Sequence, residues 1–269
     1  MAQAAAPYVR PELFDEAVDR KHRSYLSAVL GESLGTIRAR TSRQLMLIHE
    51  LWIPKLHAAG LLPLARLVEG DKMRAEVRQA DRMTRFQYDF PLICALVDQW
   101  RPKTHTFHFP VGEMTVTFED VAMLLGLPPD DGGYGHRRHV FLARFANVPR
   151  NDRAPTTYQP FDSSHGPTLT WLQQFSADYM TDDAQPETVN RFLEATLLWL
   201  FGYVMFWRRG IKVIDPYARM IADAPLEAVP QINWGSAILP ATYRGLCTAV
   251  SKGAAKQGIL LGRPLLLQL

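Results

Sequence analysis

The sequence predicts a mainly α-helical (α+β) protein: a multi-helix globular domain with a small antiparallel β-hairpin around residues 104–118. Two observations lead to this fold class. Several segments place apolar residues at helical spacing, while one short segment alternates apolar and polar residues as a strand does. In addition, 47% of the 269 residues are hydrophobic and 21% are charged, which is typical of a globular chain with a sizeable core.

Two helices are expected in the first hundred residues. The first spans Thr41 to Gly60, and Pro54 inside it is expected to kink or break it. Asp89 is the predicted N-cap of the second helix, because its side chain can accept a bond from a backbone N–H of the first turn. The apolar face of this helix is formed by Leu92, Leu96 and Trp100.

The most apolar helix is expected at 187–207. Apolar residues cover nearly its whole circumference, which predicts a central buried helix. Glu194 interrupts the apolar run, and the part that follows is too short to span a membrane. A short helix is expected at 171–180, and Asn233 or Ser236 is expected to cap the last helix.

A hairpin followed by a capped helix is the most informative local pattern. Residues 104–109 and 114–118 alternate in the manner of strands and flank a turn at 111–113. Thr117 and Asp120 have the spacing of a capping box, which predicts that a helix begins there and ends at Gly126.

The run that contains this pattern, residues 100–128, closely resembles the signature of the plant mobile domain, a family also labelled aminotransferase-like. It reads W-R-P-K-T-H-T-F-H-F-P-V-G-E-M-T-V-T-F-E-D-V-A-M-L-L-G-L-P, with Phe118 where the family usually has Leu. Weaker matches follow in the family's order at 233–239, 243–247 and 262–269.

The resemblance implies a domain organisation. We expect an N-terminal arm at 1–40 and the plant mobile domain at 41–269. A Pro-rich loop at 147–168 is a candidate joint between two lobes. The chain stops at Leu269, where the family usually continues, so the domain is expected to be C-terminally truncated relative to the family.

The resemblance also implies a function. It indicates a non-enzymatic protein derived from a transposable element, similar to the maintenance-of-meristems-like proteins. These are nuclear factors in meristem maintenance, transposon silencing and gene regulation. The implied partner is a phosphatase-like protein or a chromatin component, and the implied location is the nucleus, with the cytoplasm as the alternative. A functional host gene product and a transposon relic both stay open.

The aminotransferase-like label would imply pyridoxal phosphate, which needs a Schiff-base lysine beside a phosphate-binding loop. None of the seven lysines lies in an apolar run next to such a loop, and no Gly-x-Ser-x-Gly turn is present. We therefore expect no cofactor and no catalytic residue. An enzyme with an unrecognised site stays open as an alternative.

Metal binding is not expected either. His105 and His108 are three residues apart on a predicted strand, so they point to opposite faces and cannot hold one ion together. We expect His105 to be an inward-facing ring that is hydrogen-bonded to a neighbour. Glu113, Glu119 and Asp120 form a small acidic group, which the favourable position of negative charge at a helix start explains.

The best candidate for a working surface is a basic segment just after the hairpin. Its arginines and one aromatic residue could contact phosphates, bases or an acidic partner, so a nucleic-acid-binding module is the alternative function. The net charge of only +3 nevertheless favours a solvated loop. The candidate contacts are Tyr134, Arg137, Arg138, Arg144, Arg150 and Arg153.

The rest of the composition is unremarkable for a protein of the nucleus or cytosol. No apolar run is long enough for a membrane span, and the N-terminus lacks the pattern of a signal peptide. The two cysteines, Cys94 and Cys247, lie in apolar helical patterns and are expected to be buried thiols.

Overall fold

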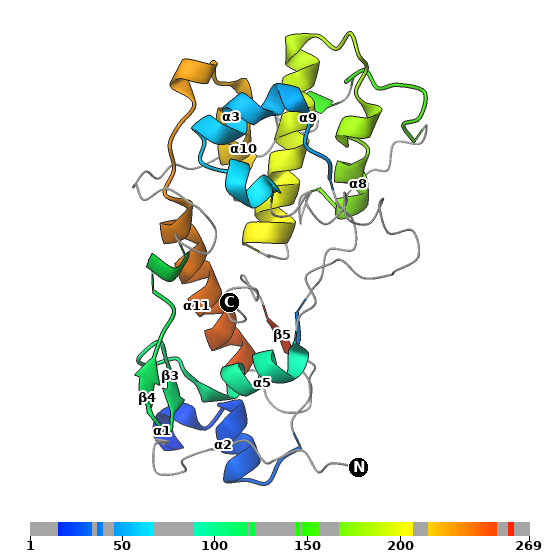
Figure 1. Cartoon of the computed structure of the whole chain (residues 1–269). Helices are drawn as coiled ribbons and strands as arrows, with labels where there is room; N and C mark the ends of the chain where they lie inside the picture. The colour runs from blue at the N-terminus through cyan, green and yellow to red at the C-terminus, as the bar shows by residue number, and fades with distance from the viewer. Residues whose placement is uncertain are drawn as a thin grey trace. The chain divides into compact units, whose positions relative to one another are not determined.

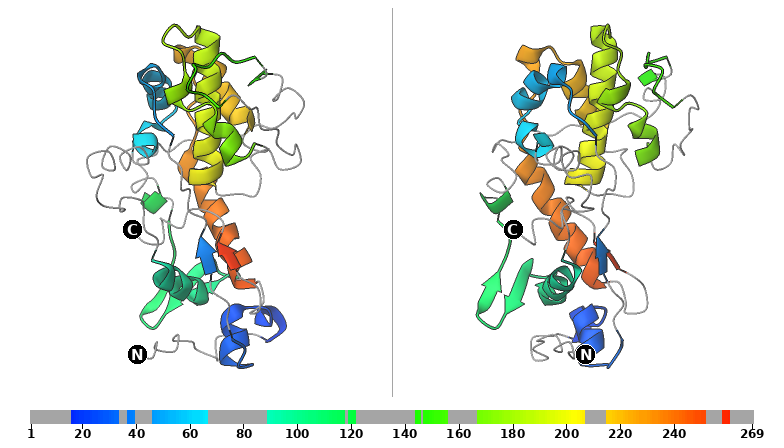
Figure 2. Two further views of the ribbon diagram at one scale, coloured as in Figure 1. Left: turned by 90° about the vertical axis from the view of Figure 1, so that its right-hand side faces the viewer. Right: turned by 45° about the vertical axis from the view of Figure 1, so that its right-hand side comes forward.

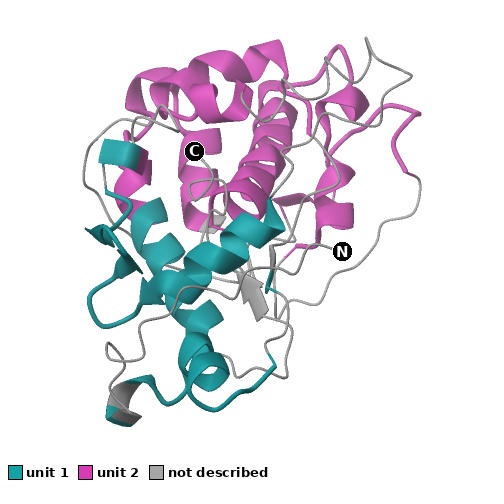
Figure 3. Ribbon diagram, turned by 60° about the horizontal axis from the view of Figure 1, so that its bottom comes forward, with its two compact units in different colours: residues 1–41, 86–120, 238–269 teal, residues 42–85, 121–237 magenta. Residues whose placement is uncertain are grey.

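The computed structural model describes residues 16–33, 37–39, 46–66, 89–117, 119–121, 144–145, 147–155, 167–206, 215–251 and 258–260. The described elements are mainly helices, together with a small antiparallel sheet, so the predicted fold class is confirmed (Figure 1). The chain divides into two compact units, each built from separate stretches of sequence (Figure 3). Unit 1 comprises residues 1–41, 86–120 and 238–269, and unit 2 comprises residues 42–85 and 121–237.

Unit 1 contains a three-stranded antiparallel sheet of order β2-β3-β4 and a two-stranded parallel sheet of β1 and β5. Its core joins residues that are far apart in the sequence, including Ile37, Val97, Phe107 and Leu246. Its elements are α1 (Glu16–Asp19), α2 (Arg23–Ala28), β1 (Ile37–Ala39), α5 (Phe90–Gln99), β2 (Trp100–Arg101), β3 (Thr106–Phe109), β4 (Gly112–Met114), most of α11 (Trp234–Ser251) and β5 (Gly258–Leu260).

Helix α5 begins as predicted, since the carboxylate of Asp89 accepts a hydrogen bond from the N–H of Leu92 at 3.0 Å. Its predicted apolar face is confirmed only in part: Trp100 is buried and Leu96 packs against the core, but Leu92 is 40% exposed and the buried positions of the helix are Ile93 and Val97. The reason is that Trp100 has an extended backbone and belongs to β2, so it does not continue the helical spacing of α5.

The hairpin is present, but its first strand begins later than predicted and its second strand begins and ends earlier. The turn lies at Pro110 and Val111, so β4 pairs with β3 from Gly112 and has ended before 115–117. Strand β3 begins only at Thr106, because the residues before it form a turn. A two-residue turn fixes the register and shifts the second strand toward the turn.

The capping box after the hairpin is confirmed. The N–H of Thr117 donates to the carboxylate of Asp120 at 2.7 Å, and the N–H of Asp120 donates to the hydroxyl of Thr117 at 3.2 Å. The bond from the Thr117 backbone, followed by that from its side chain, holds the pKa of Asp120 below its ordinary value. The predicted end of this helix at Gly126 lies outside the described residues.

The expected N-terminal arm contributes to the fold of unit 1 wherever it is described. Helix α2 buries Arg23, Ser24, Tyr25 and Leu26, and β1 pairs with β5. The residues that α2 and β1 contact lie tens to hundreds of positions further along the chain. The sequence pattern of the segment itself therefore could not predict these contacts.

Unit 2 is organised around α9 (Pro186–Trp199), which continues as a π-helix, η4 (Leu200–Met205). Figures 1 and 2 show α8 and α10 against α9. The other described elements are η2 (Glu50–Trp52), α3 (Ile53–Ala58), α8 (Leu169–Gln173), η3 (Ala177–Tyr179), α10 (Asp215–Asp223), η5 (Leu226–Ala228) and the first turn of α11.

The prediction of a central buried helix is confirmed, because every residue from Arg191 to Trp199 is buried. Glu194 is 0% exposed and needs partners inside unit 2. Among the described residues, no helix is long and apolar enough to cross a membrane.

The helix predicted at Thr41–Gly60 is shorter at its start. Residues 46–49 are not helical, and α3 begins at Ile53 with Pro54 in its first turn. Proline is favoured in the first turn because it has no N–H to leave unsatisfied, so Pro54 begins this helix and does not kink it. Its end at Gly60, with a φ of 67°, is as predicted.

The remaining predictions for unit 2 have mixed outcomes. Asn233 caps α11, since its side chain accepts from the N–H of Ser236 at 2.9 Å. The short helix predicted at 171–180 is split into α8 and η3. The described part of the Pro-rich loop has no regular element, and Asn151 fixes it through hydrogen bonds to the carbonyls of Asp178 and Met180. Both ends of this loop belong to unit 2.

Candidate functional site

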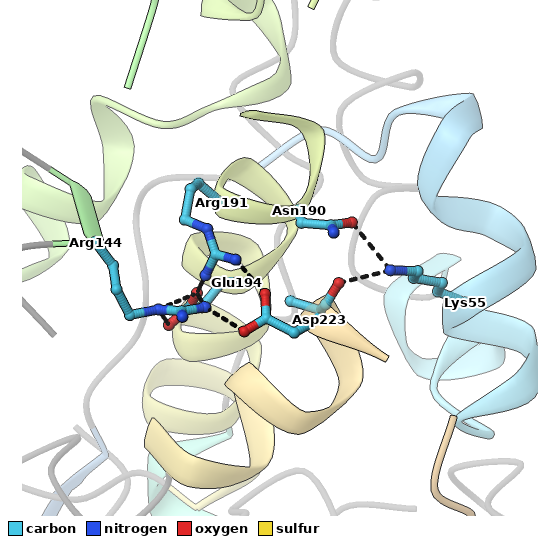
Figure 4. Close-up of polar contacts among 7 residues, drawn as sticks. Lys55, Arg144, Asn190, Arg191, Glu194 and Asp223 are labelled. Atoms are coloured by element: carbon cyan, nitrogen blue, oxygen red, sulfur yellow. Dashed lines mark hydrogen bonds and ion pairs between the residues drawn. The ribbon is translucent and has the colours of Figure 1, made fainter. Parts of the chain in front are cut away.

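A ring of four charged side chains lies inside unit 2 (Figure 4). Arg191 and Glu194 are one helical turn apart on α9, and Asp223 is the last residue of α10. Arg144 completes the ring. We call these four residues the charge ring.

Arg144 binds both carboxylates of the charge ring. Its Nε lies 3.3 Å and 3.2 Å from the two oxygens of Glu194, and its Nη2 lies 2.7 Å from Oε2 of the same residue. The same Nη2 donates to Oδ2 of Asp223 at 2.6 Å. The planar guanidinium suits this geometry, because it can present several N–H groups to carboxylates at once.

Arg191 binds the same two carboxylates from the other side. Its Nη1 donates to Glu194 and its Nη2 to Asp223. Two cations and two anions therefore close a ring with no net charge. Burial makes partners necessary for Glu194 and Arg191, whose side chains are 0% and 8% exposed, since a single charge without a partner in the interior would be costly; Asp223, at 35%, closes the ring from its exposed side.

Lys55 of α3 adds a further cation beside the charge ring. Its Nζ donates to Oδ1 of Asn190 at 2.9 Å and to the carbonyl of Ala222 at 2.6 Å, near the C-terminus of α10. Burial lowers the pKa of Lys55, and the charge of Asp223 offsets part of this effect. A lysine at this position is favoured by the negative end of the helix dipole. Its ammonium is thus used within the fold.

The charge ring has the properties of a structural contact. Each carboxylate is bound by two guanidinium groups, so neither is available as a base or a nucleophile without breaking the ring. In the described residues, no group of three or more His, Cys, Asp or Glu could hold a metal ion. The ring joins α9, α10 and the segment of Arg144 into one unit.

The charge ring corrects one sequence prediction. Arg144 was expected on a surface that contacts nucleic acid or a partner, but its guanidinium is bound to Glu194 and Asp223. Arg150 is half-buried, 5.5 Å from the ring centroid of Phe175. Arg153 is exposed, as a surface contact requires. Tyr134, Arg137 and Arg138 lie outside the described residues.

In unit 1, three rings beside the hairpin contact one another as a triangular cluster. The ring centroid of His105 is 6.0 Å from that of Trp100 and 5.4 Å from that of Tyr243, and the Trp100 and Tyr243 centroids are 5.2 Å apart. The hydroxyl of Tyr243 donates to the carbonyl of Val116 at 2.5 Å and lies 2.9 Å from the hydroxyl of Thr115. These contacts attach the hairpin to α11.

The position of His105 corrects another prediction. It was expected to face inward from a strand, but it lies in the turn before β3, is exposed, and has a φ of 57°. This conformation is rare for a residue with a side chain and places the ring across Trp100. The polar face of the hairpin is made by Glu113, which accepts from Thr106 at 3.0 Å and lies 3.4 Å from His108.

Unit 1 also contains a buried polar cluster, which attaches α2 to the end of α5. Arg23 pairs with Asp98 at 2.5 Å, and the hydroxyl of Ser24 donates to the Asp98 carbonyl at 2.6 Å. His22 lies 2.8 Å from the Trp100 carbonyl through Nε2, while its Nδ1 accepts from the N–H of Ser24. These bonds require the neutral tautomer with a proton on Nε2.

The electrostatics of this cluster follow from its burial. Burial lowers the pKa of His22 to about 4. The hydrogen bond to the Trp100 carbonyl raises this pKa in part, and the positive charge of the nearby Arg101 lowers it further. Burial raises the pKa of Asp98, and Arg23 offsets part of that rise.

Both cysteines are free and half-buried, and the indole N–H of Trp100 lies 3.3 Å from Sγ of Cys247.

Sequence reasoning missed the charge ring and the His22 cluster. One local signal for the ring exists: Arg191 and Glu194 are spaced i, i+3 on a helix that is apolar all round. Charged residues at that spacing in such a helix indicate a buried pair. No comparable signal connects His22 with Asp98 or Trp100.

Comparison with known proteins gives one family. The sequence model of the family described as "Plant mobile domain" matches residues 76–269, which is more than half of the chain. From Arabidopsis thaliana, "Protein MAIN-LIKE 2" is 36% identical over 174 residues, covering 64% of this chain and 25% of the relative. "Protein MAINTENANCE OF MERISTEMS" is 29% identical over 185 residues, covering 66% of this chain and 36% of the relative.

A third relative from the same plant has a different name. "Serine/threonine-protein phosphatase 7 long form homolog" is 31% identical over 164 residues, covering 61% of this chain and 12% of the relative. The aligned region spans a quarter of MAIN-LIKE 2 and about an eighth of the phosphatase homolog. No solved structure matches the chain.

Proposed function

The chain belongs to the plant mobile domain family, and from this premise we propose that it is a non-enzymatic interaction domain of a transposable-element-derived protein that acts in the nucleus. The proposed roles are meristem maintenance, transposon silencing and gene regulation. The name of the relative MAINTENANCE OF MERISTEMS supports the first of these.

One observation carries the non-enzymatic part of the proposal: the charged groups that gather inside unit 2 bind one another. Glu194 and Asp223 are each bound by both Arg144 and Arg191, and the ammonium of Lys55 is bound by Asn190 and Ala222. An acid–base or covalent mechanism needs a group that is held near substrate and able to change its protonation or bonding. This cluster instead stabilises the fold, which suits a domain that works through its surface.

The proposed partner is a phosphatase-like protein or a chromatin component. The test is affinity purification of the tagged chain from plant nuclei, followed by mass spectrometry of the proteins that co-purify. We expect a phosphatase-like protein or chromatin components to be enriched over a tag-only control. Enrichment of neither would contradict the proposed partners.

The chain produced in a bacterial host and purified without plant proteins tests the enzymatic alternative, which the name of the phosphatase homolog keeps in view. The purified chain is assayed with p-nitrophenyl phosphate in the presence of Mn²⁺. We expect no turnover above buffer. Turnover that co-elutes with the chain and is lost on one substitution in it would replace the non-enzymatic proposal.

The exposed side chain of Arg153 favours nucleic-acid binding as a second candidate function. Binding of this kind should weaken as salt rises, because phosphate contacts release counterions. It should also fall when Arg137→Ala and Arg138→Ala are combined. Loss of Arg144 is not a suitable test, because it would destabilise unit 2.

A further inference from the structure

Strand β4 forms the outer edge of the three-stranded sheet of unit 1. The sheet order is β2-β3-β4, and β3 is the only strand that pairs with β4 in the described part of the chain. Gly112, Glu113 and Met114 are all exposed. Such an edge carries backbone N–H and C=O groups that can pair with another strand.

The chain is open to solvent where β4 begins. A Cβ placed on Gly112, which would project from a face of the sheet, would meet no atom within 4 Å, and Val111 in the turn before it is 89% exposed. The edge is also short, so it offers few backbone bonds and needs side-chain contacts for specificity.

The two faces of the hairpin have different chemistry at β4. The register pairs Met114 with Phe107 and Glu113 with His108, so Met114 lies on the face of the buried Phe107 ring. Phe107 is 5% exposed and packs against Trp100, whereas Met114 is 58% exposed. The apolar face of the sheet therefore stops with an uncovered side chain at its edge.

The opposite face carries one negative charge at the same edge. The Glu113 side chain is 54% exposed, and it is bound on its inner side by Thr106 and His108. A strand added beside β4 would place one side chain next to Glu113 and the flanking side chains on the face of Met114. Charge complementarity favours a basic residue in the middle and apolar residues on either side.

A second copy of this chain fits the edge poorly. Antiparallel pairing of two β4 strands about their centres would place Glu113 opposite its own counterpart, and like charges directly opposite each other are destabilising. A negative charge on an edge strand protects against self-association and at the same time selects a basic partner.

We propose that the outer edge of β4 is a docking site for an extended segment of a partner protein in which a basic residue is flanked by apolar residues. The segment adds as a further strand beside β4, its basic side chain pairs with Glu113, and an apolar side chain covers Met114. This inference rests on the proposed function, because it assigns the surface through which an interaction domain would work.

The test uses the fluorescently labelled peptide Ser-Thr-Val-Lys-Val-Thr-Ser and the full chain, with binding measured by fluorescence anisotropy. We expect saturable binding that falls about threefold in Glu113→Gln, the usual effect of one cross-strand charge pair. Glu119→Gln, which removes an exposed carboxylate elsewhere in unit 1, is the matched control and should leave the affinity unchanged. A peptide with Glu in place of Lys should bind Glu113→Lys better than the natural chain.

Backbone pairing is tested on the peptide, so that the fold of the chain is not changed. N-methylation of one alternate set of peptide amides should abolish binding, while methylation of the other set, which faces solvent, should not. Equal effects of both sets, or no saturable binding at millimolar peptide, would overturn the proposal. A dimer of the chain that Met114→Ser abolishes would also overturn it and assign the edge to a second copy.

The nuclear purification separates this inference from the proposed function. If Glu113→Lys retains every partner of the natural chain, the docking site is wrong while the proposed function stands. If the natural chain retains no partner, the proposed function is wrong, whatever the peptide does.

Discussion

Unit 1 and unit 2 bury polar groups in different ways. In unit 1 the polar contacts of α2 combine one ion pair, Arg23 with Asp98, with bonds to backbone carbonyls: His22 bonds the carbonyl of Trp100, and Ser24 bonds that of Asp98. In unit 2 the charge ring consists of bonds between charged side chains. A backbone carbonyl is present whatever the side chain, whereas each member of the ring depends on the others for its charge balance. We therefore expect unit 2 to be more sensitive to single substitutions and unit 1 to be more sensitive to acid.

The largest effect is expected from Glu194→Ala in the charge ring. It leaves two guanidinium groups with one carboxylate in a buried site, which should lower the free energy of unfolding by about 3–5 kcal/mol. Urea denaturation followed by circular dichroism measures the change. The exposed Glu187 at the start of the same helix is the control, and Glu187→Ala should cost less than about 1 kcal/mol. If the two variants lose similar amounts of unfolding free energy, the charge ring does not make unit 2 especially sensitive to substitution.

The next effect is the acid sensitivity of unit 1 through His22. In the folded chain the pKa of His22 is about 4, while in the unfolded chain it is near its ordinary value of 6.5. Between these values the unfolded state binds a proton that the folded state does not, so stability falls as the pH falls. The loss reaches about 3 kcal/mol at the lower end of this range and is absent above the ordinary value.

Urea denaturation at several pH values measures this slope. His22→Gln keeps hydrogen-bonding groups at this position but cannot titrate there, so its stability should depend less on pH between about 6.5 and 4. His57→Gln, which changes an exposed histidine of unit 2, is the matched control and should keep the slope of the natural chain. An unchanged slope in His22→Gln would contradict the account of unit 1.

A smaller effect is expected from Tyr243→Phe at the attachment of the hairpin. The substitution keeps the ring beside His105 and Trp100 but removes the hydroxyl that contacts Val116 and Thr115, which should cost about 1–2 kcal/mol. Amide hydrogen exchange should rise in β3 and β4 and stay unchanged in α9. Equal changes in both would mean that the contacts of Tyr243 do not act locally in unit 1.

The smallest loss of stability is expected from removing one helix cap, and one cap from each unit can be compared. Asp89 caps α5 in unit 1 and Thr168 caps α8 in unit 2, each through one bond to a backbone N–H. Changing either to alanine should cost about 1 kcal/mol, because the lost bond is the same in kind. Thermal unfolding of the two variants measures this. A much larger loss for one cap would show that the units differ in local structure as well as in buried charge.

The predictions from sequence that are confirmed depend on neighbouring residues. The caps at Asp89 and Asn233 and the box of Thr117 and Asp120 involve residues within three positions of each other. The burial of α9 follows from apolar residues that lie on nearly all sides of the helix. Strand boundaries were less accurate, because the two-residue turn that sets the register of β3 and β4 competes with other turns of similar composition.

The charge ring shows why part of the site could not be predicted. Arg144 is fifty residues from Glu194 and seventy-nine from Asp223. In the sequence it belongs to a basic segment next to Gly- and Pro-rich stretches, which is typical of a solvated loop. Only the folding of unit 2 places it against two carboxylates, and the energy of a buried charge depends on those partners.

The sequence by itself determined the family signature, the mainly helical fold class, the hairpin, the helix caps and the buried character of α9. These features follow from periodicity and from bonds between near neighbours. The tertiary structure alone decided the pairing of β1 with β5, the neutral state of His22, the use of Arg144 inside unit 2 and the exposure of His105 and Met114. Burial, charge balance and strand pairing depend on residues that the chain brings together only when it folds.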